Sequence, residues 1–223
     1  MSEASREQGT EERWLERGTE VERTNYFSDA VFAIAITLLA LELRVPEIPT
    51  DPASGQELAA KLLEEWPRFV SFVLSFWLVG SYWIAHHRHF RYLRGYDRRV
   101  LVVNLLFLMW VVLVPFSTSL LGEYGHLQIA ANIYAANGAL AGLTLYWLWR
   151  YASRDSRLVD ATKGDPREMK YNELRDLVVP IIFLISIGIS FVSVHAAEFS
   201  WLLIFLLRPA LLRILWSRSS GRG

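Results

Sequence analysis

Residues 23–29, RTNYFSD, run directly into residues 30–43, AVFAIAITLLALEL. Residues 27–43 are mostly apolar, and about 17 such residues are enough to cross the hydrocarbon of a bilayer. Arg23 and Asp29 stand at the start of this segment, where ionisable groups are costly unless they pair or serve a function. The stretch therefore predicts a first membrane helix with candidate functional residues at its start.

The composition is that of a membrane protein. Of the 223 residues, 52% are hydrophobic and nine are tryptophan, and the charged residues gather in the loops and at the two ends. The formal net charge is zero, so there is no reason to expect nucleic acid as a partner. The absence of cysteine excludes disulfides, thiolate metal sites and cysteine catalysis.

Five further apolar segments follow, each long enough for a membrane helix. They are expected at about 67–87, 100–121, 127–149, 177–195 and 199–216. Lipid offers the backbone no hydrogen-bond partner, so runs of about 20 apolar residues predict helices. We expect an all-α integral membrane protein with six transmembrane helices, and a short amphipathic helix, Gln56 to Trp66, on the bilayer surface.

The distribution of Lys and Arg predicts the orientation. The loops after the second and fourth segments and the tail are basic, whereas the loops after the third and fifth contain no Lys or Arg. Basic loops stay in the cytoplasm, so both termini are expected there, in a multi-pass protein of the cell membrane. The predicted divisions are a polar cytoplasmic segment, 1–22, amphipathic or disordered, then a transmembrane domain, 23–216, and a basic tail, 217–223.

One face of the first helix carries an apolar stripe. Helical spacing places these residues on it: Phe27, Ala30, Ile34, Thr37, Leu38 and Leu41. The spacing alone is equally typical of a face that contacts lipid or packs against another helix.

The motif ahead of this stripe resembles that of a known family. R-x-x-x-F-S-D, at Arg23, Phe27, Ser28 and Asp29, is followed by small and branched residues in a chain with six predicted spans. This combination resembles the signature helix of the transmembrane protein 175 family, the endosomal and lysosomal potassium channels and their prokaryotic relatives. Eukaryotic members carry two such six-helix units, so this chain, with one, is similar to the prokaryotic form.

The resemblance implies a potassium-permeable cation channel without enzymatic activity or a cofactor, K⁺ being the permeant ion. The first helix would line the pore, with Ile34, Leu38 and Leu41 as apolar rings that act as the gate and Thr37 supplying hydroxyls. One such helix per chain implies a homotetramer, in which the partners are other copies of the chain, the lipid bilayer and monovalent cations. No re-entrant filter loop is expected, because GEYG at 122–125 is a loop turn unlike the TVGYG filter.

Two interpretations of the motif remain open. Ser28 or Asp29 can cap the start of the helix while Arg23 extends to lipid headgroups. The family resemblance implies instead a buried network that holds the pore helix in place. Its members would be Arg23, Phe27, Ser28, Asp29 and Trp83, with either His86 or His87.

Other chemistry has less support in the sequence. His86 and His89 are three residues apart, but a third ligand and an H-E-x-x-H pattern are lacking, so no metal site is predicted. Asn104, Asn132 and Asn137, inside predicted spans, are expected to hydrogen-bond between helices. A secondary transporter would show internal repeats or broken spans, and a non-conducting membrane scaffold would leave the motif unexplained.

Overall fold

The computed structural model describes residues 3–48, 54–154, 158–159 and 166–204, with the backbone alone for 3–20 and 166–170. Within these ranges every element is a helix, apart from one isolated bridge between Leu93 and Val159. The helices are α1 (Glu3–Leu41), α2 (Gly55–Glu64), α3 (Trp66–Tyr92), α4 (Arg98–Val112), α5 (Val114–Tyr124), α6 (Gln128–Ser153), α7 (Pro166–Asp176), α8 (Val178–Ser190) and α9 (Val194–Ser200). The predicted all-α class is therefore confirmed.

Three helical segments among the described residues are long and apolar enough to cross a membrane. They are Val21–Leu41, Trp66–Tyr92 and Arg98–Tyr124, which coincide with the first three predicted spans. Helix α6 covers the fourth predicted span. The fifth is interrupted, because α8 ends at Ser190 and the Ser193 hydroxyl accepts a hydrogen bond from Ala196 N–H to cap α9. From residue 205 onward the sixth predicted span lies outside the described residues.

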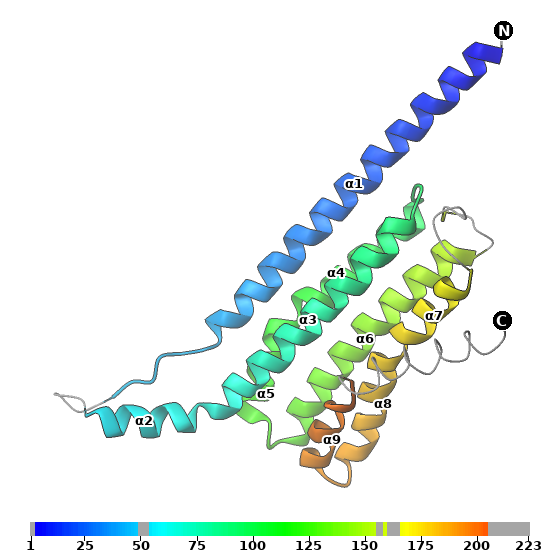
Figure 1. Ribbon diagram of the computed structural model, residues 1–223. Coiled ribbons are helices and arrows are strands. Elements are labelled where there is room, and N and C mark those ends of the chain that lie inside the picture. Colours follow the sequence, from blue (N-terminus) through cyan, green and yellow to red (C-terminus); the bar gives the residue numbers. More distant parts are fainter. Residues whose placement is uncertain (1–2, 49–53, 155–157, 160–165, 205–223) are drawn as a thin grey trace, which may run out of the picture.

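The first helix is longer than the sequence predicts. Helix α1 begins at Glu3, so the backbone of the polar lead is helical and continuous with the first span. Extending an existing helix needs no new nucleus, which is the costly step of helix formation. In Figure 1 this part of α1 projects well beyond the rest of the bundle.

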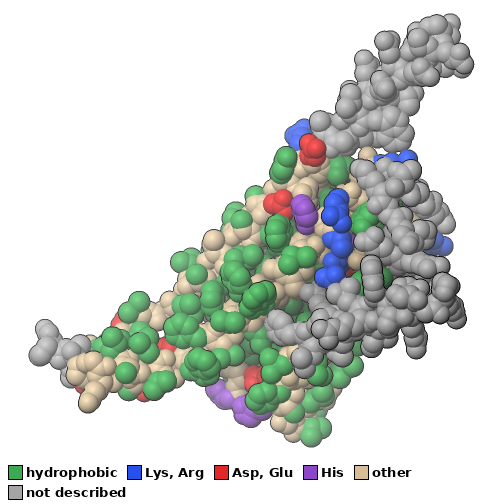
Figure 2. Space-filling model, viewed as in Figure 1, with side chains coloured by type: hydrophobic (Ala, Val, Ile, Leu, Met, Phe, Trp, Pro, Cys, Tyr) green, Lys and Arg blue, Asp and Glu red, His purple; other side chains and the backbone are tan. Residues whose placement is uncertain are grey.

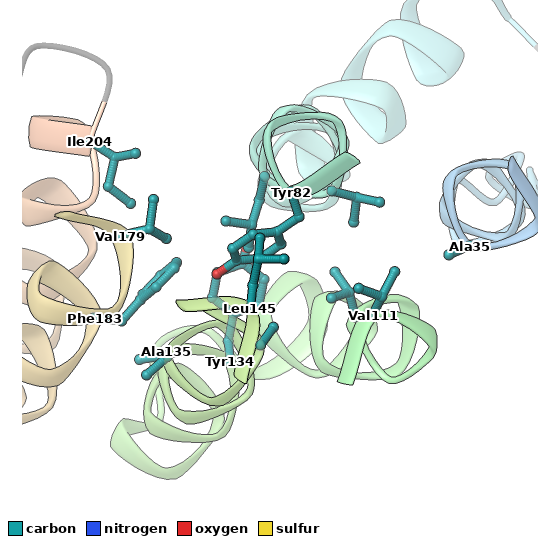
Figure 3. Close-up of a cluster of buried hydrophobic side chains, with 14 of the residues drawn as sticks. Ala35, Tyr82, Val111, Tyr134, Ala135, Leu145, Val179, Phe183 and Ile204 are labelled. Atoms are coloured by element: carbon teal, nitrogen blue, oxygen red, sulfur yellow. The ribbon is translucent and has the colours of Figure 1, made fainter. Parts of the chain in front are cut away.

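The remaining helices pack into a layered bundle (Figure 1). Helix α6 packs against α4 on one side and α8 on the other, while α1 packs at the edge against α3, α4 and α5. Side chains from several helices meet in the core (Figure 3), among them Tyr82, Val111, Tyr134, Leu145 and Phe183. Helix α2 turns away from the bundle, and none of its residues is buried.

A close contact between α6 and α8 depends on two glycines. A Cβ atom on Gly138 would approach the Phe183 ring to 2.6 Å, and one on Gly142 would approach Pro180 Cδ to 2.8 Å. Their G-x-x-x-G spacing places both glycines on the same helical face. Small residues at this spacing let membrane helices approach closely, where van der Waals packing drives association.

We expect Gly142→Ala to lower the free energy of unfolding by about 1–3 kcal/mol, because the added methyl overpacks the contact with Pro180. Gly188→Ala in α8 is the matched control, since its Cβ would meet no described atom within 4 Å. Ala is the better helix former, so the control is expected to be neutral or stabilising by up to about 1 kcal/mol. Unfolding in detergent, followed by circular dichroism, measures both. Equal effects of the two substitutions would contradict the packing role of Gly142.

The third span is broken at Leu113, between α4 and α5. Pro115 has no N–H to continue the helical hydrogen bonds, and the Asn137 side chain of α6 lies against the break. With its oxygen turned toward α5, the Asn137 amide accepts from Val114 N–H at 3.2 Å and donates to the Trp110 carbonyl at 3.1 Å. The side chain therefore satisfies backbone groups that the break exposes in a lipid environment.

Candidate functional site

Helix α1 presents one buried face to the bundle. Its fully or nearly buried side chains are Val21, Ser28, Phe32, Ala35 and Leu39. Their spacing of seven, four, three and four residues is that of a single helical face. This face contacts α3, α4 and α5, so the orientation of α1 about its own axis is set by packing within the chain.

The predicted apolar stripe lies on the exposed side. The exposed fractions are 59% for Ile34, 38% for Leu38 and 74% for Leu41, and Phe27 is also exposed. Thr37, on the same side, donates its hydroxyl hydrogen to the Ile34 carbonyl at 2.9 Å, which leaves the hydroxyl oxygen available to water or an ion. The stripe is therefore not a packing face within the described part of the chain.

Ser28 is the first member of a buried hydrogen-bond chain. Its hydroxyl donates to the Thr24 carbonyl at 2.9 Å and accepts from Asn104 Nδ2 of α4 at 3.0 Å. The Asn104 oxygen in turn lies 2.9 Å from His86 Nε2 of α3. Because that oxygen can only accept, His86 is assigned as the donor through Nε2. Three helices are thus joined by hydrogen bonds that all run in one direction.

Aromatic rings hold the histidine in this position. The His86 ring is fully buried, and it stacks on Phe90 with ring centroids 4.1 Å apart and on Phe107 at 5.7 Å. Phe32 of α1 lies 5.7 Å from the same ring. The imidazole therefore has one ring orientation, in which Nε2 faces Asn104.

Asp29 makes a second link between α1 and α3. Its carboxylate accepts from Trp83 Nε1 at 2.8 Å, and Asn25 Nδ2 approaches its other oxygen at 3.4 Å. Ser28 and Asp29 lie deep inside a helix that begins at Glu3, so the interpretation of either as an N-terminal cap is wrong. The reason is that the polar residues before the span are themselves part of α1, so the helix begins well before Ser28 and Asp29.

The structure does not bring every predicted member into this network. Arg23 is exposed and has no hydrogen bond or ion pair among the described residues, and Phe27 is also exposed. Arg23 and Phe27 border a hollow of about 390 Å³ between α1 and α4. Of the two histidines, His86 faces the motif, whereas His87 is exposed beside Trp83, with ring centroids 5.9 Å apart.

Asn104 is the residue that sequence reasoning did not place in the network. The sequence predicted only that Asn104 hydrogen-bonds between helices, and this is confirmed. The same prediction is confirmed for Asn137 and for Asn132, whose oxygen accepts from Ser190 at 2.8 Å. A polar amide at the depth of the motif was the available signal. The sequence could not show that the partner of Asn104 is Ser28, because the two residues are 76 positions apart.

A second buried polar cluster was also missed. Asp176, at the end of α7, lies 2.9 Å from Arg88 Nη2 and 2.6 Å from His89 Nε2. His89 is fully buried and stacks on Trp149, with ring centroids 4.5 Å apart. This cluster joins α3 to α6 and α7 beyond the motif network. An acidic residue directly before an apolar segment was its only signal in the sequence.

These features define an all-helical, multi-pass membrane protein. The model of the family described as the endosomal/lysosomal potassium channel TMEM175 matches residues 23–115, which include the motif and the whole hydrogen-bond chain. A potassium channel of Chamaesiphon minutus is 36% identical over 179 residues, covering 79% of this chain and 87% of the relative. This chain belongs to the TMEM175 family.

Two further comparisons agree with this assignment. A potassium channel of Streptomyces collinus is 33% identical over 175 residues, covering 77% of this chain and 82% of the relative. The crystal structure of a lysosomal potassium-selective channel TMEM175 homolog from Chamaesiphon minutus superimposes with a TM-score of 0.73 at 32% identity. That alignment covers 88% of this chain and 98% of the other.

Proposed function

We propose that this chain is a potassium-permeable cation channel whose pore is lined by the exposed face of α1. The observation that carries the proposal is the rotation of α1. The face of α1 that carries Ser28, Phe32 and Ala35 is buried against the bundle. The stripe with Ile34 and Leu38 has no packing partner in the described chain. The similar proteins named potassium channels support K⁺ as the permeant ion.

A pore of this kind needs several copies of the chain. One chain contributes one α1 helix, and a closed ring of such helices requires rotational symmetry. We propose a homotetramer, in which the stripes of four α1 helices face a common axis. Assembly would also remove Phe27 and Leu41, both more than half exposed, from contact with lipid.

The proposed gate is the apolar constriction formed by Ile34, Leu38 and Leu41. A narrow ring of Ile and Leu side chains excludes water, and an ion cannot leave its hydration shell there, so conduction requires the ring to widen. Thr37 would place hydroxyl groups between these rings. Passive flow along this path needs neither a cofactor nor a catalytic residue, and no re-entrant filter loop is part of the proposal.

The motif network would hold the pore helix at the correct rotation. Ser28 and Asp29 bind α1 to α3 and α4 from the buried side, opposite the stripe. A rotation of α1 by one residue, about 100° in an α-helix, would break both links and remove the stripe from the axis. This proposed role needs Asn104 and His86 as well as the motif.

The proposed topology has six transmembrane helices, both termini in the cytoplasm and the cell membrane as the location. In it α4 and α5 form one broken span, and the sixth span is the one predicted at 199–216. The polar lead, 1–22, and the basic tail, 217–223, would flank the channel domain, 23–216. The distribution of Lys and Arg among the loops supports this orientation.

Purified protein in liposomes under a potassium gradient tests the function. We expect potassium flux that does not saturate as transport does, with unitary current steps in single-channel recording. Saturable flux at transporter turnover would indicate a secondary transporter, and no flux would favour a non-conducting scaffold. Either result would refute the channel.

A further inference from the structure

An apolar groove on the outside of the bundle lies between α3 and the α8–α9 pair. Its volume is about 210 Å³, and its lining residues are Leu74, Trp77, Leu78, Ser81, Ile84, Arg175, Phe183, Trp201 and Ile204. The only hydroxyl among them, that of Ser81, donates to the Leu78 carbonyl of its own helix at 2.8 Å. Pockets that enclose a small molecule measure roughly 300–1,000 Å³. This smaller, apolar groove instead suits one chain of a larger molecule whose remainder stays in the bilayer.

One end of the groove carries a positive charge, that of Arg175, which no described residue pairs. Arg175 Nε is buried without a hydrogen-bond partner among the described residues, and no ion pair of Arg175 occurs within them. The neighbouring carboxylate of Asp176 accepts from Arg88 Nη2 at 2.9 Å and lies 2.6 Å from His89 Nε2, and no contact between it and Arg175 is among the ion pairs of the described residues. Residues 205–223, which continue the chain from the groove, include no Asp or Glu. Among the described residues the Arg175 guanidinium therefore has no carboxylate partner, and its Nε–H remains free to donate to an anion.

The same helical face of α3 is basic beyond the groove. Ile84, Arg88 and Arg91 follow one another at spacings of four and three residues, so the apolar wall continues into two arginines. Arg91 is exposed and lies over the Tyr92 ring, 5.5 Å from its centroid. Figure 2 shows a row of Lys or Arg side chains directly beyond the apolar surface of the bundle.

We propose that this groove binds an anionic phospholipid, with one acyl chain along α3 and the phosphate at Arg175. The lipid comes from the leaflet on the arginine-rich side of the bundle. Arginine is suited to phosphate because its planar group donates two parallel hydrogen bonds. The apolar walls of the groove bind the acyl chain, and the Arg175 guanidinium favours a headgroup with net negative charge.

A binding experiment with Arg175→Gln tests the headgroup. Full-length protein in detergent is titrated with dioleoyl phosphatidylglycerol or dioleoyl phosphatidylcholine, and bound lipid is counted by native mass spectrometry. We expect wild type to prefer phosphatidylglycerol, and Arg175→Gln to weaken its binding about fivefold, as expected for one arginine near an anionic headgroup. Arg175→Lys should retain most of the preference.

The matched control is Arg98→Gln, which removes the same charge from an exposed position at the start of α4. It should leave phosphatidylglycerol binding within twofold of wild type. Equal losses in Arg98→Gln and Arg175→Gln would show attraction by surface charge alone and overturn the site. Unchanged binding in Arg175→Gln would overturn it as well.

Two further variants test whether the groove holds the chain of the lipid. Ile84→Trp fills the groove without changing its charge, and it should weaken the binding of phosphatidylglycerol as much as Arg175→Gln does.

Because the protein has no cysteine, Ser81→Cys can also be combined with Leu207→Cys for disulfide trapping. Rapid and complete formation of this disulfide would show that the polypeptide segment around Leu207 occupies the groove, which would refute lipid binding there. Protection of a single Ser81→Cys thiol from a membrane-soluble maleimide by phosphatidylglycerol would support it.

Discussion

Ile34→Asn is expected to raise resting potassium flux at least about tenfold, since about 1.4 kcal/mol removed from a barrier is a tenfold change in rate. The amide would hydrate the proposed constriction, so an ion could pass without leaving its water shell. Flux assays in liposomes, together with the open probability in single-channel recording, measure the effect. The substitution changes an exposed side chain, so the fold should tolerate it.

Ile185→Asn in α8 is the matched control. Its side chain is 56% exposed, close to the 59% of Ile34, but it lies on a helix that the proposal places away from the pore. The control should leave resting flux at the wild-type level. If Ile34→Asn also leaves flux unchanged while Leu38→Asn raises it, the gate lies one turn further along α1. If neither raises flux, the stripe is not the constriction.

Asn104→Leu is expected to lower the free energy of unfolding by about 1–3 kcal/mol. It leaves the buried His86 Nε2–H without an acceptor, which costs about 1–3 kcal/mol, whereas the Ser28 hydroxyl keeps its hydrogen bond to the Thr24 carbonyl. Thermal or denaturant unfolding in detergent, followed by tryptophan fluorescence, measures the loss. Flux should fall with it, because α1 is no longer held at its proposed rotation.

Two further variants distinguish a stability loss caused by breaking this hydrogen-bond network from a loss that any Asn→Leu substitution would cause. In Asn132→Leu the partner Ser190 keeps its bond to the Ile187 carbonyl at 2.8 Å, so a smaller loss is expected. The triple variant Ser28→Ala, Asn104→Leu, His86→Phe removes all three polar groups together and should recover much of the stability. Equal losses for Asn132→Leu and Asn104→Leu would contradict the special position of Asn104.

Several features could be predicted from local patterns. Hydropathy over windows of about 20 residues identified the first three spans, and the helical period placed Ile34, Leu38 and Leu41 on one face. Pattern could not show whether that face was packed, because a membrane helix is apolar on all sides. The burial of Ser28, Phe32 and Ala35 on the opposite side resolved this within the described chain.

Other features depended on contacts that pattern does not encode. The sequence pointed to Arg23 as part of the motif network, but in the structure it is exposed, while Asn104 occupies the centre. His86 and His87 are neighbours in sequence and differ by about 100° around α3, so only the packed orientation of that helix separates them.

The stretch from Arg23 to Leu43 by itself determined that this protein enters a membrane and that its first helix is unusual. Those conclusions follow from composition and period, which are local properties of the chain. The tertiary structure alone decided that Ser28 reaches Asn104 across 76 residues, that His86 completes the chain of bonds and that Arg175 remains without an anion among the described residues. The physical reason is that hydrogen bonds act over about 3 Å. Which residues come that close is decided by the rotation and packing of whole helices.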